Sequence, residues 1–219
     1  MDASIWEEIE EARARWNVLE HPFYQRWSRG ELERDELAAY AGQYRHAVVA
    51  LADAAADAAR MAAPELRPQL AAHAAEEAGH VALWDDFTAA MGGDPAATAN
   101  PETAACARAW AGDGERNLLH SLVALYAIES GQPAIADTKR QGLREFYGCE
   151  SGPATAYFDL HAELDHEHAA AERALIEPRL EAADEDALVA EAEAVLRANW
   201  ELLDGVERVT AARRSPTAG

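Results

Sequence analysis

The spacing of apolar residues constrains this chain more than any other feature of its sequence. Nearly every segment repeats these residues with the 3.6-residue period of an α-helix, and no segment alternates valine, isoleucine and threonine as a half-buried strand does. Hydrophobic residues make up 49% of the 219 residues, which is enough to bury a sizeable core. The sequence therefore predicts an all-α fold.

Proline, glycine and capping residues divide the chain into its expected helices. We expect these over residues 4–19, 22–27, 33–61, 64–90, 101–111, 115–130, 133–147, 153–180 and 184–212, of which residues 22–27 form only a short helix. Residues 94–100 are expected to form a loop, and residues 213–219 a frayed tail. No long polar linker divides the sequence, so we predict one domain over residues 1–219, built from seven or eight helices.

Charge and composition exclude several classes of partner. Lysine and arginine total 19 against 40 aspartates and glutamates, a formal net charge of −21, so the surface should repel nucleic acid and anionic membranes. The N-terminus lacks the basic region and apolar run of a signal peptide, and no stretch reaches the ~18 apolar residues of a membrane span. The two cysteines cannot form a disulfide framework. We expect a cytoplasmic protein without nucleic-acid or membrane partners.

The helix expected over residues 153–180 carries the most informative polar pattern. His161, Asp165 and His168 fall on one helical face, and Tyr157 and Leu164 place that face toward the core. Burying an unpaired carboxylate costs several kcal/mol, so buried charges normally have a cation or a metal as partner. A structural histidine–aspartate hydrogen-bond network is the alternative. Three such residues on one core face favour a divalent metal in the iron, manganese or zinc range.

A second set of possible ligands lies in the helix over residues 64–90. Glu76 and His80 are four residues apart, and Glu77 and His80 are three apart, so either pair could chelate a metal. Trp84 indicates that this side of the helix faces the core. The alternative is a solvated acidic edge, which an acidic protein has in abundance.

Glu129, at the end of an apolar helix, is a third candidate source of metal ligands. It continues the face of Leu122, Leu125 and Tyr126, so it is either the partner of a buried arginine or a bridging metal carboxylate. Taken together, three carboxylates and three histidines from three helices match the ligand count of a dinuclear iron-type site.

A ferritin-like arrangement would use the Glu-x-x-His pattern twice. The pattern occurs at Glu77 and His80 and again at Glu163 and His166. The second pair shares its face with Glu167, on the solvated side of its helix, so we reject that arrangement.

Residues 19–32, LEHPFYQRWSRGEL, and residues 37–40, LAAY, resemble the haem-oxygenase-like helical superfamily, which includes thiaminase II and the pyrroloquinoline-quinone synthesis protein C. The chain is most similar to the family of the chlamydial protein associating with death domains, and this resemblance extends to Glu177. Members of that family are dimetal oxidases implicated in making 4-aminobenzoate for folate. A tyrosine of the protein supplies the ring, and a lysine is implicated in supplying the amino group. The resemblance implies a haem-oxygenase-like bundle.

The resemblance also implies roles for individual residues. The family's metal ligands fall on Glu129, His161, Asp165 and His168, and the remaining pair falls on His80 and Glu76. In the family this glutamate lies two turns before its histidine, a position that His73 occupies here, whereas Glu76 lies one turn before His80. A three-residue deletion before His80 would explain the difference, and Glu77 and His73 compete with Glu76.

The residues that would react follow from the same resemblance. The implicated lysine is Lys139, the only lysine in the chain. A neutral amine can act as a nucleophile, which arginine cannot do, although a single residual lysine could also stand there by chance. Tyr24 and Tyr40 match two of the family's tyrosines, and Tyr24 is the expected source of the ring. Ile128 replaces a further tyrosine beside the bridging glutamate.

The resemblance and the ligand pattern together lead to one expected function. We expect a homodimeric oxidoreductase that binds two iron ions, or iron and manganese, and uses O2 to form 4-aminobenzoate from its own side chains. The alternatives are a dimetal oxidase of a small amino- or fatty-acid-like molecule, a metal-free enzyme like thiaminase II or the quinone-synthesis protein, and a non-catalytic binding or regulatory protein.

Overall fold

The computed structural model describes residues 4–112, 114 and 116–214, and these contain helices and no strand. Eight of the helices have eleven residues or more, within the expected seven to eight, and α2 has six. The all-α prediction is confirmed. The α-helices are α1 (Ile5–Arg15), α2 (Pro22–Trp27), α3 (Arg34–Met61), α4 (Arg67–Ala90), α5 (Pro101–Ala111), α6 (Leu118–Glu129), α7 (Gln132–Phe146), α8 (Ala156–Ile176) and α9 (Glu185–Arg214), with short 3-10 helices η1 (Val18–Glu20) and η2 (Glu177–Ala182).

Some helix ends differ from the sequence prediction for identifiable reasons. α8 begins at Ala156 rather than at residue 153, because residues 152–155 form a turn closed by the Thr155 N–H, which donates to the Gly152 carbonyl at 2.9 Å, and Thr155 has a φ of −120°, outside helical geometry. It ends at Ile176, and the chain continues as the 3-10 helix η2, whose first turn contains Pro178, a residue with no N–H to donate. α9 continues through residues 213 and 214, which the sequence assigned to a frayed tail. The rest of that predicted tail, residues 215–219, lies outside the described residues.

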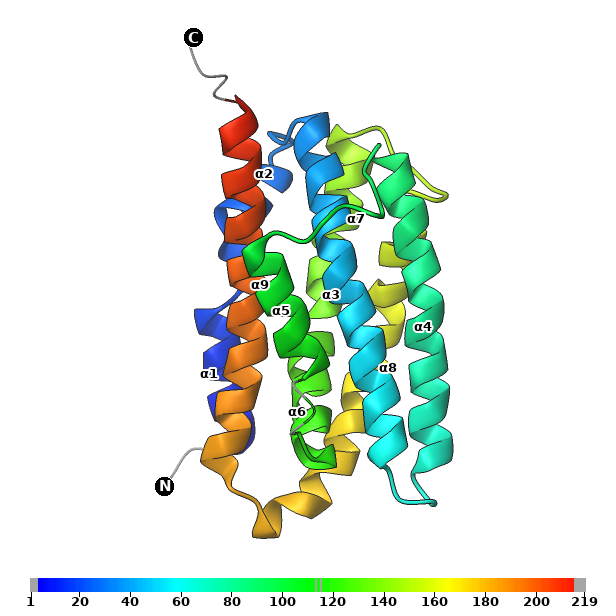
Figure 1. Cartoon of the computed structure of the whole chain (residues 1–219), viewed down its shortest axis with the longest axis vertical. Helices are drawn as coiled ribbons and strands as arrows, with labels where there is room; N and C mark the ends of the chain where they lie inside the picture. The colour runs from blue at the N-terminus through cyan, green and yellow to red at the C-terminus, as the bar shows by residue number, and fades with distance from the viewer. Residues whose placement is uncertain (1–3, 113, 115, 215–219) are drawn as a thin grey trace.

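The long helices run along one another and enclose a continuous apolar core (Figure 1). α3 and α4 form an antiparallel pair, and α8 packs against α4, α6 and α7 (Figure 1). α1 and α9 lie together on the other side of the bundle. The inner faces of α4, α6, α7 and α8 therefore meet in the interior.

A close contact between α2 and α7 brings the N-terminal part of the chain to this interior. A Cβ at Gly142 would lie 2.5 Å from the Trp27 ring, so only glycine allows α7 to approach α2 so closely. The Trp27 indole N–H donates to the carbonyl of Lys139 at 3.2 Å. This packing holds Lys139 of α7 near the side chains of α2.

No helix in the described part of the chain combines the length and the apolar character needed to cross a bilayer. The single-domain organisation, the homodimer and the cytoplasmic location stay predictions from the sequence.

Candidate metal centre

Two helical faces that carry donor groups lie opposite each other in the bundle. On α4, His73, Glu77 and His80 follow one another at intervals of four and three residues, which keeps them on one face. On α8, His161 and His168 lie across from them. The ring centroids of His73 and His168 are 4.5 Å apart, and those of His80 and His161 are also 4.5 Å apart. Two antiparallel helices thus bring four imidazoles together in pairs.

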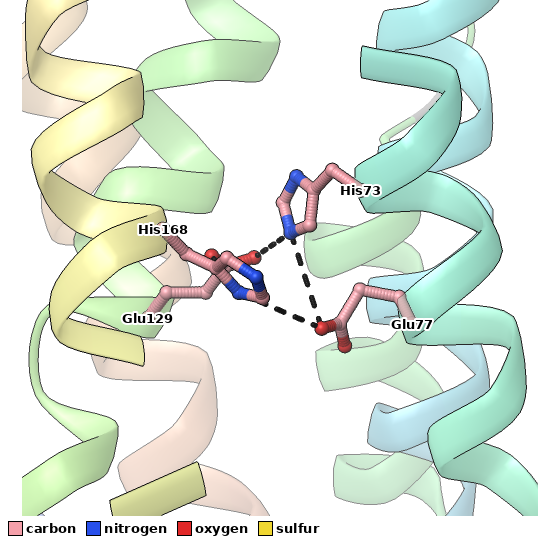
Figure 2. Close-up of side chains that lie close together, drawn as sticks. All are labelled: His73, Glu77, Glu129 and His168. Carbon is pink, nitrogen blue, oxygen red and sulfur yellow. Dashed lines mark ion pairs between the residues drawn. The ribbon is translucent and has the colours of Figure 1, made fainter. Parts of the chain in front are cut away.

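Glu129, at the last turn of α6, and Asp165 of α8 complete this set, and each is 1% exposed. The His73 Nε2 atom lies 3.1 Å from Glu129 Oε1, and the His168 Nδ1 atom lies 3.6 Å from Glu129 Oε2 and 3.7 Å from Asp165 Oδ1. Figure 2 shows side chains from α4, α6 and α8 pointing toward one another. We call the whole set the donor cluster: His73, Glu77, His80, Glu129, His161, Asp165 and His168.

Glu77 occupies the middle of the donor cluster. Its Oε1 atom lies 3.0 Å from His80 Nδ1 on one side, and 3.9 and 4.0 Å from His73 Nε2 and His168 Nδ1 on the other. The donor atoms form two groups, and within each group the atoms lie within 4.8 Å of one another, close enough to surround an ion. The groups are His73–Glu77–Glu129–His168 and Glu77–His80–His161. Glu77 belongs to both, so the geometry is that of two adjacent sites with a shared carboxylate.

Hydrogen bonds outside the donor cluster fix which histidine nitrogen faces inward. The His161 Nδ1–H donates to the Tyr157 carbonyl at 2.7 Å, which leaves Nε2 as the lone-pair atom. The His168 Nε2–H donates to Glu76 at 3.1 Å, which leaves Nδ1 as the lone-pair atom. Metal-binding histidines commonly have their second nitrogen held in this way.

The inward atoms of the donor cluster lack hydrogen-bond partners although they are buried. This holds for the inward nitrogen of all four histidines, for Glu77 Oε1, and for both carboxylate oxygens of Glu129 and Asp165. Buried polar atoms of this kind are nearly always paired. Some of these atoms lie within ion-pair distance of one another, but none makes a hydrogen bond. Converging imidazole nitrogens and carboxylate oxygens are the ligand set that iron and manganese accept. The residues present therefore fit a dimetal group.

Burial controls the charges of the donor cluster when no cation balances them. It raises the pKa of Asp165 to about 8, with a contribution from the charge of Glu77. Burial also raises the pKa of Glu129 well above its ordinary range, and it lowers the pKa of His161 to about 4. Burial therefore favours the uncharged forms of Asp165, Glu129 and His161 in the metal-free protein. Metal binding must release protons from the carboxyls.

Glu76, the ligand that the sequence favoured on this helix, does not enter the donor cluster. Its side chain is 54% exposed, and it contacts His168 from the outer side. The reason is helical phase, because Glu77 is seven residues before the buried Trp84 whereas Glu76 is turned away by about 100°. The structure places Glu76 on the outer side of His168, and it places Glu77 between the two groups of donor atoms. Glu163 and His166 are exposed, as expected.

Glu172 is a buried carboxyl that the sequence analysis missed. It is 2% exposed, and neither of its oxygens has a hydrogen-bond partner. Burial raises its pKa well above the usual range, with further contributions from the charges of Glu129, Glu77 and Asp165. The signal was present in the sequence, since Glu172 is seven residues after Asp165 and four after His168 on the same face of α8.

Lys139 lies in a pocket lined by aromatic rings and is 1% exposed. Its Nζ atom is 4.6 Å from the centroid of the Tyr44 ring, 5.4 Å from that of Tyr40 and 5.6 Å from that of Tyr24. Desolvation by this apolar surrounding lowers the pKa of the amine well below its ordinary value. We call this the aromatic pocket: Tyr24, Tyr40, Tyr44, Trp84 and Phe158 around Lys139.

A continuous series of ring contacts joins the aromatic pocket to the donor cluster. The Tyr24 and Tyr40 hydroxyls are 3.1 Å apart and share a hydrogen bond. The ring centroids of Tyr40 and Trp84 are 6.0 Å apart, those of Trp84 and Tyr157 are 4.8 Å apart, and Tyr157 stacks on His161 at 3.9 Å. Side chains from α2, α3, α4 and α8 thus form one connected path.

The two cysteine thiols and the cavity beside α1, α7 and α9 lie away from this path. Cys106 is buried in the core, and burial raises the pKa of its thiol; burial also raises the pKa of the half-buried Cys149 thiol. Neither thiol is therefore activated as a nucleophile. A cavity of about 320 Å³ beside α1, α7 and α9 is lined by none of the residues of the donor cluster or the aromatic pocket.

The chain matches known proteins in both sequence and fold. Residues 38–200 match a family described as iron-containing redox enzymes. A 4-aminobenzoate synthase of Chlamydia trachomatis serovar D is 33% identical over 201 residues, which cover 86% of this chain and 85% of that protein. A 4-aminobenzoate synthase of Nitrosomonas europaea is 31% identical over 210 residues, covering 87% of this chain and 85% of that protein.

Solved structures with low sequence identity share the architecture. A protein of unknown function from Shewanella denitrificans, described as having a heme oxygenase-like fold, has a TM-score of 0.79 at 18% identity and covers 100% of this chain and 98% of its own. A TenA homologue from P. horikoshii has a TM-score of 0.77 at 16% identity, covering 94% and 99% of the two chains. These two likenesses show the haem-oxygenase-like fold.

Proposed function

Because this chain belongs to the iron-containing redox enzyme family, we propose that it uses O2 at a dimetal centre to make 4-aminobenzoate. Membership of this family makes the chain an oxidoreductase rather than a non-catalytic binding protein. The proposed metals are two irons, or iron and manganese, held by the donor cluster. The observation that carries the proposal is the path of ring contacts from the donor cluster to Tyr24 and Lys139.

The donor cluster has the composition that an O2-activating centre requires. Two redox-active metal ions bound there would activate O2, which is the oxidant of the proposed reaction. Glu77 would bridge the two ions, Glu129 and Asp165 would balance their charge, and Tyr157 and Glu76 would hold the ligand histidines in one tautomer. The unpaired buried atoms of these residues support this assignment.

The aromatic pocket would supply the substrate from the protein itself. We propose that O2 is the oxidant for cleavage of the Tyr24 Cα–Cβ bond, so that the ring leaves with Cβ as the carboxyl carbon of the product. The Lys139 nitrogen would replace the phenolic oxygen of that ring, with cleavage of the Lys139 Cε–Nζ bond. Burial raises the pKa of the Tyr24 hydroxyl and lowers the pKa of the Lys139 amine, so it favours the uncharged form of both groups. An uncharged amine has the lone pair that a nucleophile needs. The rings of Tyr40, Trp84 and Tyr157 offer a path for electrons from Tyr24 toward the donor cluster.

A small external substrate or a metal-free reaction is less well supported. The metal-free alternative leaves the unpaired donor cluster without a role, and a thiaminase-type reaction lacks an activated thiol. The names of the sequence relatives also favour 4-aminobenzoate as the product.

The function can be tested with protein purified without chelator. We expect metal analysis to give close to two transition-metal ions per chain. After loading with Fe(II), alone or with Mn(II), reduction and exposure to O2, mass spectrometry should detect 4-aminobenzoate and a loss of mass from the peptide that contains Tyr24. No product under any metal loading, together with O2 uptake, would leave a dimetal oxidase of another substrate as the better proposal.

A pair of neighbouring glutamates gives a sharp test of the metal ligands. We expect Glu77→Gln to lower the bound metal from two ions toward one or none, because the amide removes the charge shared by both groups. Glu76→Gln should keep full stoichiometry at saturating metal and weaken the affinity by at most about 10–100-fold, the usual effect of a group that orients a ligand. Full metal content in Glu77→Gln with loss in Glu76→Gln would reverse the assignment.

A further inference from the structure

A cavity between α4 and α8 reaches the donor cluster from the protein surface. It has a volume of about 160 Å³, and its rim includes Gln69, Ala72 and Glu76, which are all exposed. Deeper in the cavity lie His73 and His168, whose side chains are only 11% and 12% exposed. These two histidines also belong to the donor cluster, so the cavity opens directly onto the proposed metal centre.

Glu172 forms part of the wall of the same cavity and has no structural partner there. Both of its carboxylate oxygens are buried and unpaired. Like Asp165, it belongs to neither group of donor atoms that could surround an ion, but Asp165 lies 3.7 Å from His168 Nδ1, whereas no ion pair in the described structure joins Glu172 to the donor cluster. A buried carboxylate without a partner is costly, and no hydrogen bond in the described structure accounts for it. Its position beside the two histidines gives it a partner only when a cation is present in the cavity.

We propose that this cavity is the access route by which divalent metal ions reach the donor cluster, with Glu172 as the buried carboxylate that binds them in transit. The inference rests on the proposed function only in requiring a resident metal centre. Glu76 at the rim would attract the ion, Glu172 would replace part of its water shell, and His73 and His168 would pass it inward. The net charge of −21 favours cations at the surface around the rim.

The test is the rate at which metal-free protein takes up Co(II), followed by the visible absorption of the bound ion. In Glu172→Gln we expect uptake at limiting Co(II) to be at least about tenfold slower than in the wild type. The approaching cation favours the ionised carboxylate of Glu172, whereas the amide stays neutral, and charge in a cleft raises association rates by about 10–10³-fold. The final stoichiometry should equal that of the wild type, because Glu172 is not a resident ligand. Glu167→Gln, on the exposed face of the same helix, is the matched control and should leave the rate unchanged.

A second variant tests the route by its shape rather than by its charge. Ala72 lies exposed on the rim, so Ala72→Trp should obstruct the cavity without disturbing the core, and we expect it also to slow uptake at unchanged stoichiometry. Wild-type rates in both variants would overturn the access route while leaving the metal centre intact. A lower stoichiometry in Glu172→Gln would overturn it as well, since Glu172 would then be a resident ligand. A wild-type protein that takes up no Co(II) would overturn the metal centre and the route together.

Discussion

Replacing Tyr24 by phenylalanine should abolish release of 4-aminobenzoate while leaving the bound metal unchanged. The phenylalanine ring fits the same space, but it lacks the hydroxyl through which a buried tyrosine loses a proton together with an electron. Tyr24 is 1% exposed and lies well outside the donor cluster, so the substitution should not disturb the metal ligands. The lost hydrogen bond to Tyr40 should lower the unfolding free energy by only ~1 kcal/mol. The measurement is mass spectrometry of both the product and the protein after exposure to O2.

Two other tyrosines give this prediction its controls. Tyr126 of α6 is 8% exposed and lies outside the aromatic pocket, so Tyr126→Phe should release product at the wild-type level. Tyr40→Phe should lower the yield without abolishing it, because Tyr40 contacts Tyr24 and is not the source of the ring. If Tyr24→Phe released a normal amount of product, another residue would be the source of the ring.

Much of the donor cluster could be predicted from sequence, because its residues repeat with the period of a helix. His161, Asp165 and His168 share one face of α8, and a polar set on an apolar face needs a partner wherever that face is buried. The same reasoning applied to Glu129 at the end of the apolar α6. For these four residues the local pattern already determines the direction of the side chain.

The choice between Glu76 and Glu77 could not be made in this way. Both are within one turn of His80, and the resemblance implied a change of spacing before His80 that left Glu76, Glu77 and His73 in competition. What decides between them is which face of the whole helix points to the core. The buried Trp84 marks that face, and Glu77 lies on it because it is seven residues, or about two turns, before Trp84. The apolar pattern over the whole of α4, taken together with Trp84, favours Glu77 and also places His73 on the inner face.

The approach of Lys139 to Tyr24 had no local signal at all. The two residues are on α7 and α2, and they meet because Gly142 allows Trp27 to pack against α7. Such a contact between distant segments depends on tertiary packing, and in the sequence it was available only through the resemblance to a family. Glu172 is the opposite case, because its position on the face of Asp165 and His168 follows from its spacing along α8. The pattern of His161, Asp165 and His168 extends one turn further, to Glu172.

Replacing Lys139 by methionine should also abolish product release, and it should not destabilise the protein. Methionine has a similar length and no polar atom to desolvate, so it suits a pocket formed by aromatic rings and 1% exposed to solvent. We expect full metal content and an unfolding free energy equal to or above that of the wild type. Arg140→Met, at a half-buried position on the same helix, is the matched control and should release product normally.

The arginine variant separates the amine of Lys139 from its positive charge. Lys139→Arg should release no product, because a guanidinium stays protonated and cannot act as a free amine. It should also unfold more easily, by several kcal/mol, because a permanent charge would be buried among the rings of Tyr24, Tyr40 and Tyr44. Full product release from Lys139→Arg would exclude the amine as the nitrogen source.

An isotope experiment tests whether Lys139 is the nitrogen source without any substitution. Lys139 is the only lysine in the chain, so protein produced with lysine labelled by 15N at its side-chain nitrogen carries the label at that single side chain. If Lys139 donates its nitrogen, the 4-aminobenzoate released by the labelled protein should carry 15N in its amino group. Unlabelled product from labelled protein would mean that the nitrogen comes from elsewhere, and Lys139 would then act by holding or protonating the reacting ring.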